Sequence, residues 1–202
     1  KDLEFITAID FGTSTPRLSG VIETNSMPNL ISLIANDNHI QDFIFSNQNN
    51  TNISEVRLND NKLTGNVNTY ILQNATTISL DRNLFTTITS LESYTNLENF
   101  HCSDNNITSA IPALNSNIVI FEMGKNNLTG QIPSLASFNN LEEINLEENQ
   151  LTGVLPSLVA NTKLKKFNVS GNSNLTGSIP SLLANTALSS FEAKDNNLTG
   201  WA

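Results

Sequence analysis

One asparagine recurs through this chain at intervals of 21 to 24 residues, and its spacing constrains the fold more than any other feature. Each copy stands ninth in a unit that reads L-x-x-I-x-L-x-x-N-x-L, seen most plainly from Leu141 to Leu151. A fixed period of this length is typical of solenoids, in which each unit forms one coil of a stack. The eight copies are Asn38, Asn61, Asn83, Asn105, Asn126, Asn149, Asn172 and Asn196.

The first half of each unit alternates apolar and polar residues, which predicts a short strand with one buried face. Strands of stacked coils lie about 4.8 Å apart and build a parallel sheet. Where each strand ends, the asparagine turns inward, and its amide can satisfy backbone groups that the turn leaves unpaired. We therefore expect the eight asparagines to form a structural ladder, not a catalytic or metal-binding set, since buried polar groups are normally hydrogen-bonded.

The second half of the unit is equally regular. The run L-T-G-x-I-P-S-L from Leu128 to Leu135 recurs from Leu151, with Leu155 in place of the isoleucine, and from Leu175, with a looser copy from Ile107. Glycine permits a turn, and proline fixes φ and stops a helix or ladder. This half should therefore consist of extended segments and 3₁₀ turns, with at most brief helical turns such as one near residues 182–184.

Together the two halves resemble the plant-specific class of leucine-rich repeat, LxxLxLxxNxLTGxIPxxL, found in receptor-kinase ectodomains and polygalacturonase-inhibiting proteins. The resemblance implies a right-handed curved solenoid of about nine repeats, with a parallel β-sheet on the concave face and 3₁₀ or extended turns on the convex face. It also implies binding of peptides, glycans or proteins on the concave or lateral face, although a fold of this kind does not specify the ligand.

Two features depart from the plant pattern. Plant ectodomains usually carry paired cysteines in their caps, whereas this chain has a single cysteine, Cys102. The wording Pro-Ser-Leu followed by Asn-Thr-x-Leu, at 161–164 and 185–188, is more similar to repeats of bacterial surface adhesins and phage tail or fibre proteins. These features favour a microbial or viral origin over a plant one.

We expect one leucine-rich-repeat domain over residues 1–202, with a degenerate first repeat at 1–29 and eight repeats at 30–202. The first repeat would begin at Ile6, with Ile9 and Phe11 inward and Ser14 in place of the asparagine. Solenoids need caps over their exposed ends, and the sequence stops within a repeat. We therefore expect the sequence to be a segment of a longer chain. The alternative is that Trp201 folds over the last coil as a minimal lid.

The charge of the chain limits its partners. Lys and Arg number 10 against 19 Asp and Glu, for a net charge of −9, so nucleic acid is not an expected partner. No basic amphipathic stretch suggests a membrane surface, and no apolar run of about 18 residues would span a bilayer.

Most of the negative charge should lie on one face. The third, fifth, seventh and eighth positions of the units, expected on the concave face, carry 12 acids and 5 bases, or 7 of the 9 excess negative charges. Such a face could steer a basic or polyhydroxylated ligand, or simply keep the sheet soluble. It has no aromatic stripe to stack sugars. The expected ligand-binding residues are Arg57, Asp60, Asp81, His101, Asp104, Glu122, Glu143, Asn145, Glu147, Glu148 and Glu192.

Other candidate sites are weaker. Cys102 occupies an inward position and should be a small buried hydrophobe. His101 with Asp81, Ser103 and Asp104 invites a hydrolase hypothesis, but triads are recognised by geometry and not by co-occurrence. Aspartates of the eighth position could hold calcium, although Arg82 and Lys125 interrupt that column. We expect no cofactor, metal or catalytic residue.

Glycosylation sequons begin at Asn52, Asn74, Asn106, Asn127, Asn174 and Asn197.

Four functions follow, in order of preference. The first is a non-enzymatic module that binds a protein or cell-surface glycan, displayed on a microbial cell or virion as part of a larger protein or assembly. The second is an extracellular receptor or enzyme-inhibitor ectodomain of plant type. The third is an enzyme. The fourth is a surface for a crystalline or polymeric ligand, which would need a flat outward column of one residue type.

Overall fold

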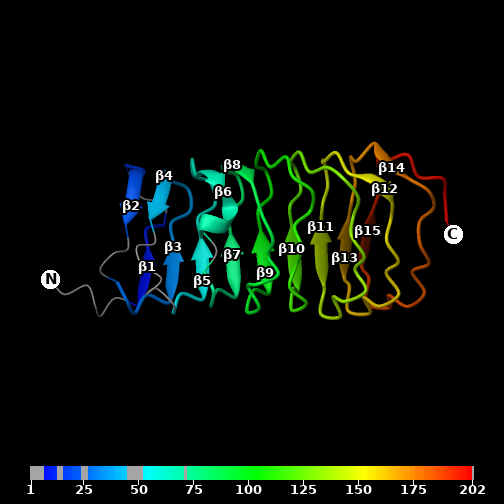
Figure 1. Ribbon diagram of the computed structural model, residues 1–202, viewed down its shortest axis with the longest axis horizontal. Helices are drawn as coiled ribbons and strands as arrows, with labels where there is room; N and C mark the ends of the chain where they lie inside the picture. The colour runs from blue at the N-terminus through cyan, green and yellow to red at the C-terminus, as the bar shows by residue number, and fades with distance from the viewer. Residues whose placement is uncertain (1–6, 13–15, 24–26, 45–51, 71, 202) are drawn as a thin grey trace.

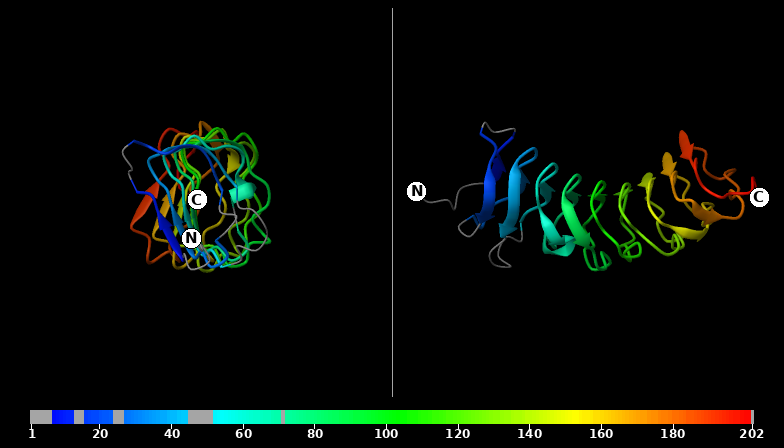
Figure 2. Two further views of the ribbon diagram at one scale, coloured as in Figure 1. Left: turned by 90° about the vertical axis from the view of Figure 1, so that its left-hand side faces the viewer. Right: turned by 90° about the horizontal axis from the view of Figure 1, so that it is seen from above.

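The computed structural model describes residues 7–12, 16–23, 27–44, 52–70 and 72–201. The coils stack side by side into an arc (Figures 1 and 2), with the main sheet on its inner, concave side. That sheet has nine parallel strands, in the order in which they occur along the chain. They are β1 (Ala8–Asp10), β3 (Ser32–Ile34), β5 (Glu55–Arg57), β7 (Thr77–Ser79), β9 (Asn99–His101), β10 (Ile120–Glu122), β11 (Glu143–Asn145), β13 (Lys166–Asn168) and β15 (Ser190–Glu192).

The returning half of the coils forms three smaller parallel pairs. They are β2 (Ser19–Glu23) with β4 (His39–Ile44), β6 (Thr64–Asn66) with β8 (Leu84–Thr87), and β12 (Thr152–Val154) with β14 (Asn174–Thr176). One 3₁₀ helix, η2 (Val67–Tyr70), follows β6. The helical turn expected near residues 182–184 is only a hydrogen-bonded turn, closed by the Asn185 N–H on the Leu182 carbonyl at 3.0 Å. The leucine-rich-repeat solenoid predicted from the repeat is thus confirmed, with almost no helix.

The main strands keep one register along the whole sheet, so each position of the unit forms a straight row. Phe121 is paired with Phe100 on one side and with Ile144 on the other. Phe100 and Phe121 are fully buried and stack with their ring centroids 5.9 Å apart. The core is therefore a continuous apolar ribbon, to which every coil adds a few side chains. Cys102 belongs to it, fully buried as expected.

The asparagine at the ninth position of each unit joins adjacent coils. Asn126 Nδ2 donates to the carbonyl oxygens of Met123 and Gly124 in its own turn, at 3.3 and 3.2 Å, and to that of Cys102 in the preceding coil, at 2.9 Å. Its Oδ1 accepts the Ile107 N–H at 3.1 Å. Asn61, Asn83, Asn105 and Asn149 bond in the same way. Each amide satisfies donors and acceptors that a buried turn would otherwise leave unpaired.

A second set of buried asparagines, which was not predicted from the sequence, lies on the returning side of the coils. Asn115 donates to the carbonyls of Tyr94 and Leu97, each at 3.0 Å, and Asn161 and Asn185 repeat this bridge two and three coils later. Phe138 fills the equivalent place in the intervening coil, where it is buried. Either an amide bridge or a buried apolar side chain therefore fills this place in the coil.

The backbone conformation at the eighth position of the units favours particular residue types. All its described non-glycine residues from the second coil onward have φ between 48° and 58°, in the left-handed region. Aspartate tolerates that region better than most residues. They are Asp37, Asp60, Arg82, Asp104, Lys125, Glu148 and Asp195, with Gly171 in the same place at φ 75°. Part of the acidity assigned to the concave face is therefore a requirement of the turn.

At the two ends of the described chain, core residues are only partly covered. Ile9 and Phe11 pack against the core as expected, whereas Ile6 and Ser14 lie outside the described residues. Trp201 lies 6.3 Å from the Phe191 ring, yet 68% of it is exposed. It contacts the last coil without closing it, so the lid expected of Trp201 is partial.

Candidate functional site

The middle of the concave sheet presents an acidic surface built by register. The last residue of each main strand faces outward beside the buried central residue, and neighbouring strands align these residues one to one. From β7 to β15 the row reads Ser79, His101, Glu122, Asn145, Asn168 and Glu192. Five of the expected ligand-binding residues lie in this row, since Arg57 of β5 is in register with Ser79 and His101, Glu122, Asn145 and Glu192 follow.

His101 and Glu122 form the tightest contact in this row. His101 Nδ1 hydrogen-bonds Glu122 Oε2 at 2.7 Å, and both side chains are about one-quarter exposed. The hydrogen bond to Glu122 raises the pKa of His101, and the same bond lowers the pKa of Glu122. Nearby, burial raises the pKa of Asp81, although its Oδ1 accepts the Ser103 N–H at 2.7 Å. These three groups form a coupled, partly desolvated cluster.

The His101–Glu122 pair predicts a pH dependence of stability. The raised pKa of His101 gives a stabilisation that is complete below its usual pKa of 6.5 and is lost as pH rises through the raised value. The lowered pKa of Glu122 gives a second stabilisation, which is complete above pH 4.5 and is lost as pH falls through the lowered pKa. Glu122→Gln should therefore cost about 0.5–1 kcal/mol between these pH values and much less at pH 9, measured by urea unfolding. An equal cost at both pH values would contradict the pairing, and Glu98→Gln, an acid outside the pair, is the matched control.

A shallow hollow of about 120 Å³ lies over β10, β11, β13 and β15. It lies over the strand backbone at Ile144 and Phe167, whose side chains are buried in the core, and its rim carries the carboxylates of Glu122, Glu143 and Glu192 against one cation, Lys166. Lys166 Nζ pairs with Glu143 at 3.0 Å, and Ser190 donates to Glu192 at 3.0 Å. The hollow keeps an excess of two negative charges, which suits a basic group.

The other expected residues lie apart from this hollow. Arg57 pairs with Glu55 at 2.6 Å within β5, and Arg82 binds both carboxylate oxygens of Asp60, at 2.5 and 2.6 Å. Asp104 and Glu148 belong to the left-handed turns that follow the strands. Glu147 accepts the Asn168 amide at 2.8 Å.

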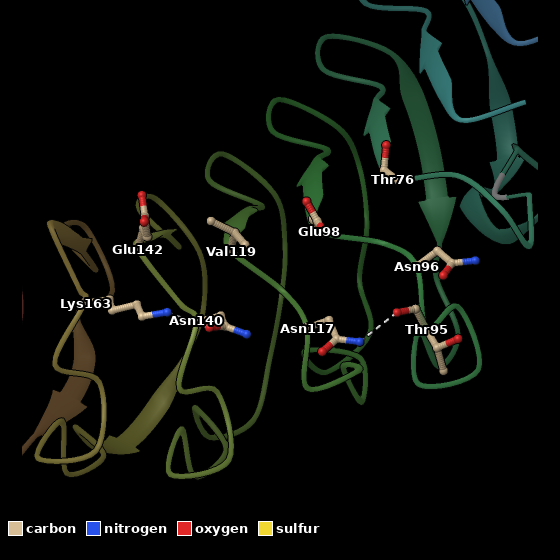
Figure 3. A pocket seen from close by; sticks show the side chains of 9 residues that line it. All are labelled: Thr76, Thr95, Asn96, Glu98, Asn117, Val119, Asn140, Glu142 and Lys163. Carbon is tan, nitrogen blue, oxygen red and sulfur yellow. Dashed lines mark hydrogen bonds between the residues drawn. The ribbon is translucent and has the colours of Figure 1, made fainter.

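A second depression was not foreseen from the sequence. We call it the lateral groove; it has a volume of about 370 Å³ and lies on the edge at which the chain enters the main strands. Figure 3 shows that successive coils contribute its side chains in two rows. One row is Thr76, Glu98, Val119 and Glu142, and the other is Asn96, Asn117, Asn140 and Lys163. The signal that could have found it is an asparagine before the first apolar residue of six successive units.

The positions of these side chains test the catalytic triad and the metal site that were considered from the sequence. His101 bonds Glu122, and Asp81 accepts a backbone N–H, so these groups are not arranged as a hydrogen-bonded Ser-His-Asp triad. Over the described ranges, no group of three or more His, Cys, Asp or Glu residues is placed to hold a metal ion. No helix in the same ranges is long and apolar enough to cross a membrane.

Comparisons with known proteins agree with this architecture. A family model described as Leucine Rich Repeat matches residues 140–162, and no curated protein matches the chain. Three solved structures resemble it at 22–23% identity, and the chain spans less than two-fifths of each of them.

The first is the Arabidopsis receptor kinase HAESA, in complex with the peptide hormone IDA and the co-receptor SERK1, with a TM-score of 0.73 over 95% of this chain and 38% of that one. The second is YopM from Yersinia enterocolitica, at 0.69 over 90% and 36%. The third is the ectodomain of GASSHO1/SCHENGEN3 from Arabidopsis thaliana, at 0.67 over 90% and 29%. With the repeat and the stacked coils, these likenesses show the fold of a leucine-rich-repeat solenoid, whose repeats resemble the plant-type class.

Proposed function

We propose that the chain is a non-enzymatic binding module that recognises a protein or peptide through its concave face. The observation that carries this proposal is the hollow over β10 to β15, where register gathers three carboxylates around one lysine. A shallow site with a few convergent charged groups is suited to bind the charged head of a basic side chain.

The ligand that fits this site carries lysine or arginine. Excess negative charge draws a basic partner and speeds association. Carboxylates on adjacent strands also suit the planar guanidinium of arginine, which can bond two oxygens at once. A neutral glycan gains less than a cation from the excess carboxylates of this hollow, so it is the weaker candidate for the concave face.

The setting we propose is extracellular or surface-exposed, on a microbial cell or a virion, as part of a larger protein. The wording of the repeats and the absence of paired cysteines support an adhesin that recognises a receptor. The structural neighbours support the alternative, a plant-type receptor or enzyme-inhibitor ectodomain, since HAESA is described in complex with a peptide hormone. Glycan occupancy at Asn127 in the native protein would favour this alternative.

Selection from a random peptide display library tests the proposal. We expect peptides with arginine or lysine to be enriched on the protein. The double variant Glu143→Lys and Glu192→Lys should bind these peptides at least tenfold more weakly, because it reverses two of the three carboxylates of the hollow.

The matched control is Glu92→Lys with Glu98→Lys, which changes the net charge equally but away from the hollow. It should retain binding within about threefold, because salt screens the long-range attraction that the distant charges exert on the peptide. Equal loss in both double variants would mean that only net charge attracts the peptides, and would overturn the proposal.

A further inference from the structure

The lateral groove offers a second, chemically different surface. Its two rows advance by one coil at a time, so the same pair of positions is repeated across four coils (Figure 3). Adjacent coils are spaced about 4.8 Å apart, the distance between hydrogen-bonded strands. A groove with a translational repeat suits a ligand with a repeat of its own. We propose that this groove binds an extended, neutral β-linked glycan, with one sugar residue for each coil.

The asparagine row is the outward column of one residue type that a polymeric ligand requires. Asn29, Asn52, Asn74, Asn96, Asn117 and Asn140 all occupy this position and are all exposed. Among the groove residues, Asn117 Nδ2 donates to the Thr95 carbonyl of the preceding coil at 2.9 Å, which holds its side chain along the edge. The amide oxygen of Asn117 has no protein partner within the described chain, so it can accept from a ligand.

Coil stacking by itself does not require asparagine at this position. Lys163 and Ala187 occupy it in the next two coils, and the backbone bonds between coils continue unchanged there. The Lys165 N–H donates to the Glu142 carbonyl at 2.7 Å, and the Ser189 N–H to the Lys165 carbonyl at 2.8 Å. Asn52, Asn96 and Asn117 each donate to a carbonyl of the preceding coil, but the stack continues without these bonds where asparagine is absent.

The groups along the groove are mixed donors and acceptors with little net charge. Glu142 is neutralised by Lys165 at 2.6 Å, and Lys163 donates to Asn140 Oδ1 at 2.8 Å. Among the described residues, neither the Glu98 carboxylate nor the Thr95 hydroxyl has a protein partner. Hydroxyl groups of a sugar can both donate and accept, so they match such a surface, whereas a polyanion or polycation gains little from it.

Spacing distinguishes a glycan from a peptide. An extended peptide repeats on one side every two residues, or about 6.6 Å, and loses register with coils 4.8 Å apart after about two steps. Each residue of an equatorially linked pyranose chain advances by a distance close to one coil, so register is kept across the groove. The threonines of the L-T-G tails do not offer such a column, because Thr152 pairs with Asn174 and Gln131, not with Thr176 and Thr129.

Titration calorimetry with defined oligosaccharides tests the proposal. The probes are cellohexaose and chitohexaose, both neutral and β-1,4-linked, with maltohexaose as the α-linked control. At least one β-linked hexamer should bind saturably, and affinity should rise about tenfold from its dimer to its tetramer and then level off. Maltohexaose should bind at least tenfold more weakly, because its curved chain cannot follow the groove. No binding by either β-linked hexamer, or equal binding by maltohexaose, would overturn the proposal.

Variants then locate the site. Val119→Arg places a long side chain in the middle of the groove and should weaken binding at least tenfold, with an unchanged unfolding midpoint. Glu98→Ala removes an exposed, unpartnered carboxylate at no structural cost and should weaken it severalfold. The concave double variant Glu143→Lys and Glu192→Lys should bind the sugar as the wild type does. Undiminished binding in both groove variants would contradict the groove, without bearing on peptide binding by the concave face.

Discussion

Replacement of Asn126 by leucine is expected to destabilise the protein by about 3–5 kcal/mol, because each buried polar group left without a partner costs about 1–3 kcal/mol. The leucine cannot donate to the carbonyls of Cys102, Met123 and Gly124, and it leaves the Ile107 N–H without its acceptor. Leucine has the same number of side-chain heavy atoms as asparagine and the same branch point, so it keeps the outline of the side chain, with bulkier ends, while it removes every hydrogen bond.

Urea unfolding, followed by circular dichroism, measures this effect. Asn106→Ala is the matched control, since Asn106 is the adjacent residue but its side chain is exposed, and it should change stability by no more than about 0.5 kcal/mol. A loss below about 1 kcal/mol in Asn126→Leu would show that the amide does not hold adjacent coils together.

Replacement of Phe121 by alanine should have an effect of similar size, about 3–5 kcal/mol, from lost burial and the cavity left behind. Phe121 is fully buried and stacks on Phe100 with 5.9 Å between the ring centroids. In a solenoid each coil contacts only its neighbours, so a cavity in the central coil uncouples the two halves of the stack. We expect the unfolding transition to broaden, as well as to move to lower urea concentration.

The graded control for this prediction is Phe121→Leu. It keeps most of the apolar volume and should cost only about 1–1.5 kcal/mol, with the transition still sharp. Equal losses for leucine and alanine would contradict the view that the filled centre of the sheet couples the coils.

The repeat made the fold predictable because one residue in each unit, the ninth, has a role that no apolar residue can fill. Once Asn126 and its counterparts are aligned, the strands, the inward residues and the buried Cys102 follow from period and alternation. The three-residue strands need no further information, since neighbouring coils impose one register on all of them.

The site was less predictable, for two physical reasons. Column positions identify which charges share a face, but not which of them pair: Arg57 is held by Glu55, Arg82 by Asp60 and His101 by Glu122. The eighth-position aspartates also satisfy a left-handed turn, so their charge is not evidence of a ligand.

The lateral groove escaped prediction because exposed residues carry no periodic burial signal. Asn96, Asn117 and Asn140 stand directly before the inward residue that begins each unit, where the hydrophobic pattern sets no constraint on side-chain type. The buried bridge of Asn161 and Asn185 was missed for a different reason. Phe138 fills the same place in the preceding coil, so the position is not invariant.

The most direct test of the concave site is carboxyl-group footprinting of the protein, with and without a saturating basic peptide obtained by display selection. The concave site predicts that labelling of Glu122, Glu143 and Glu192 falls severalfold on binding, while labelling of the distant Glu92 stays the same. Protection confined to acids outside the hollow, or no protection at saturation, would contradict it.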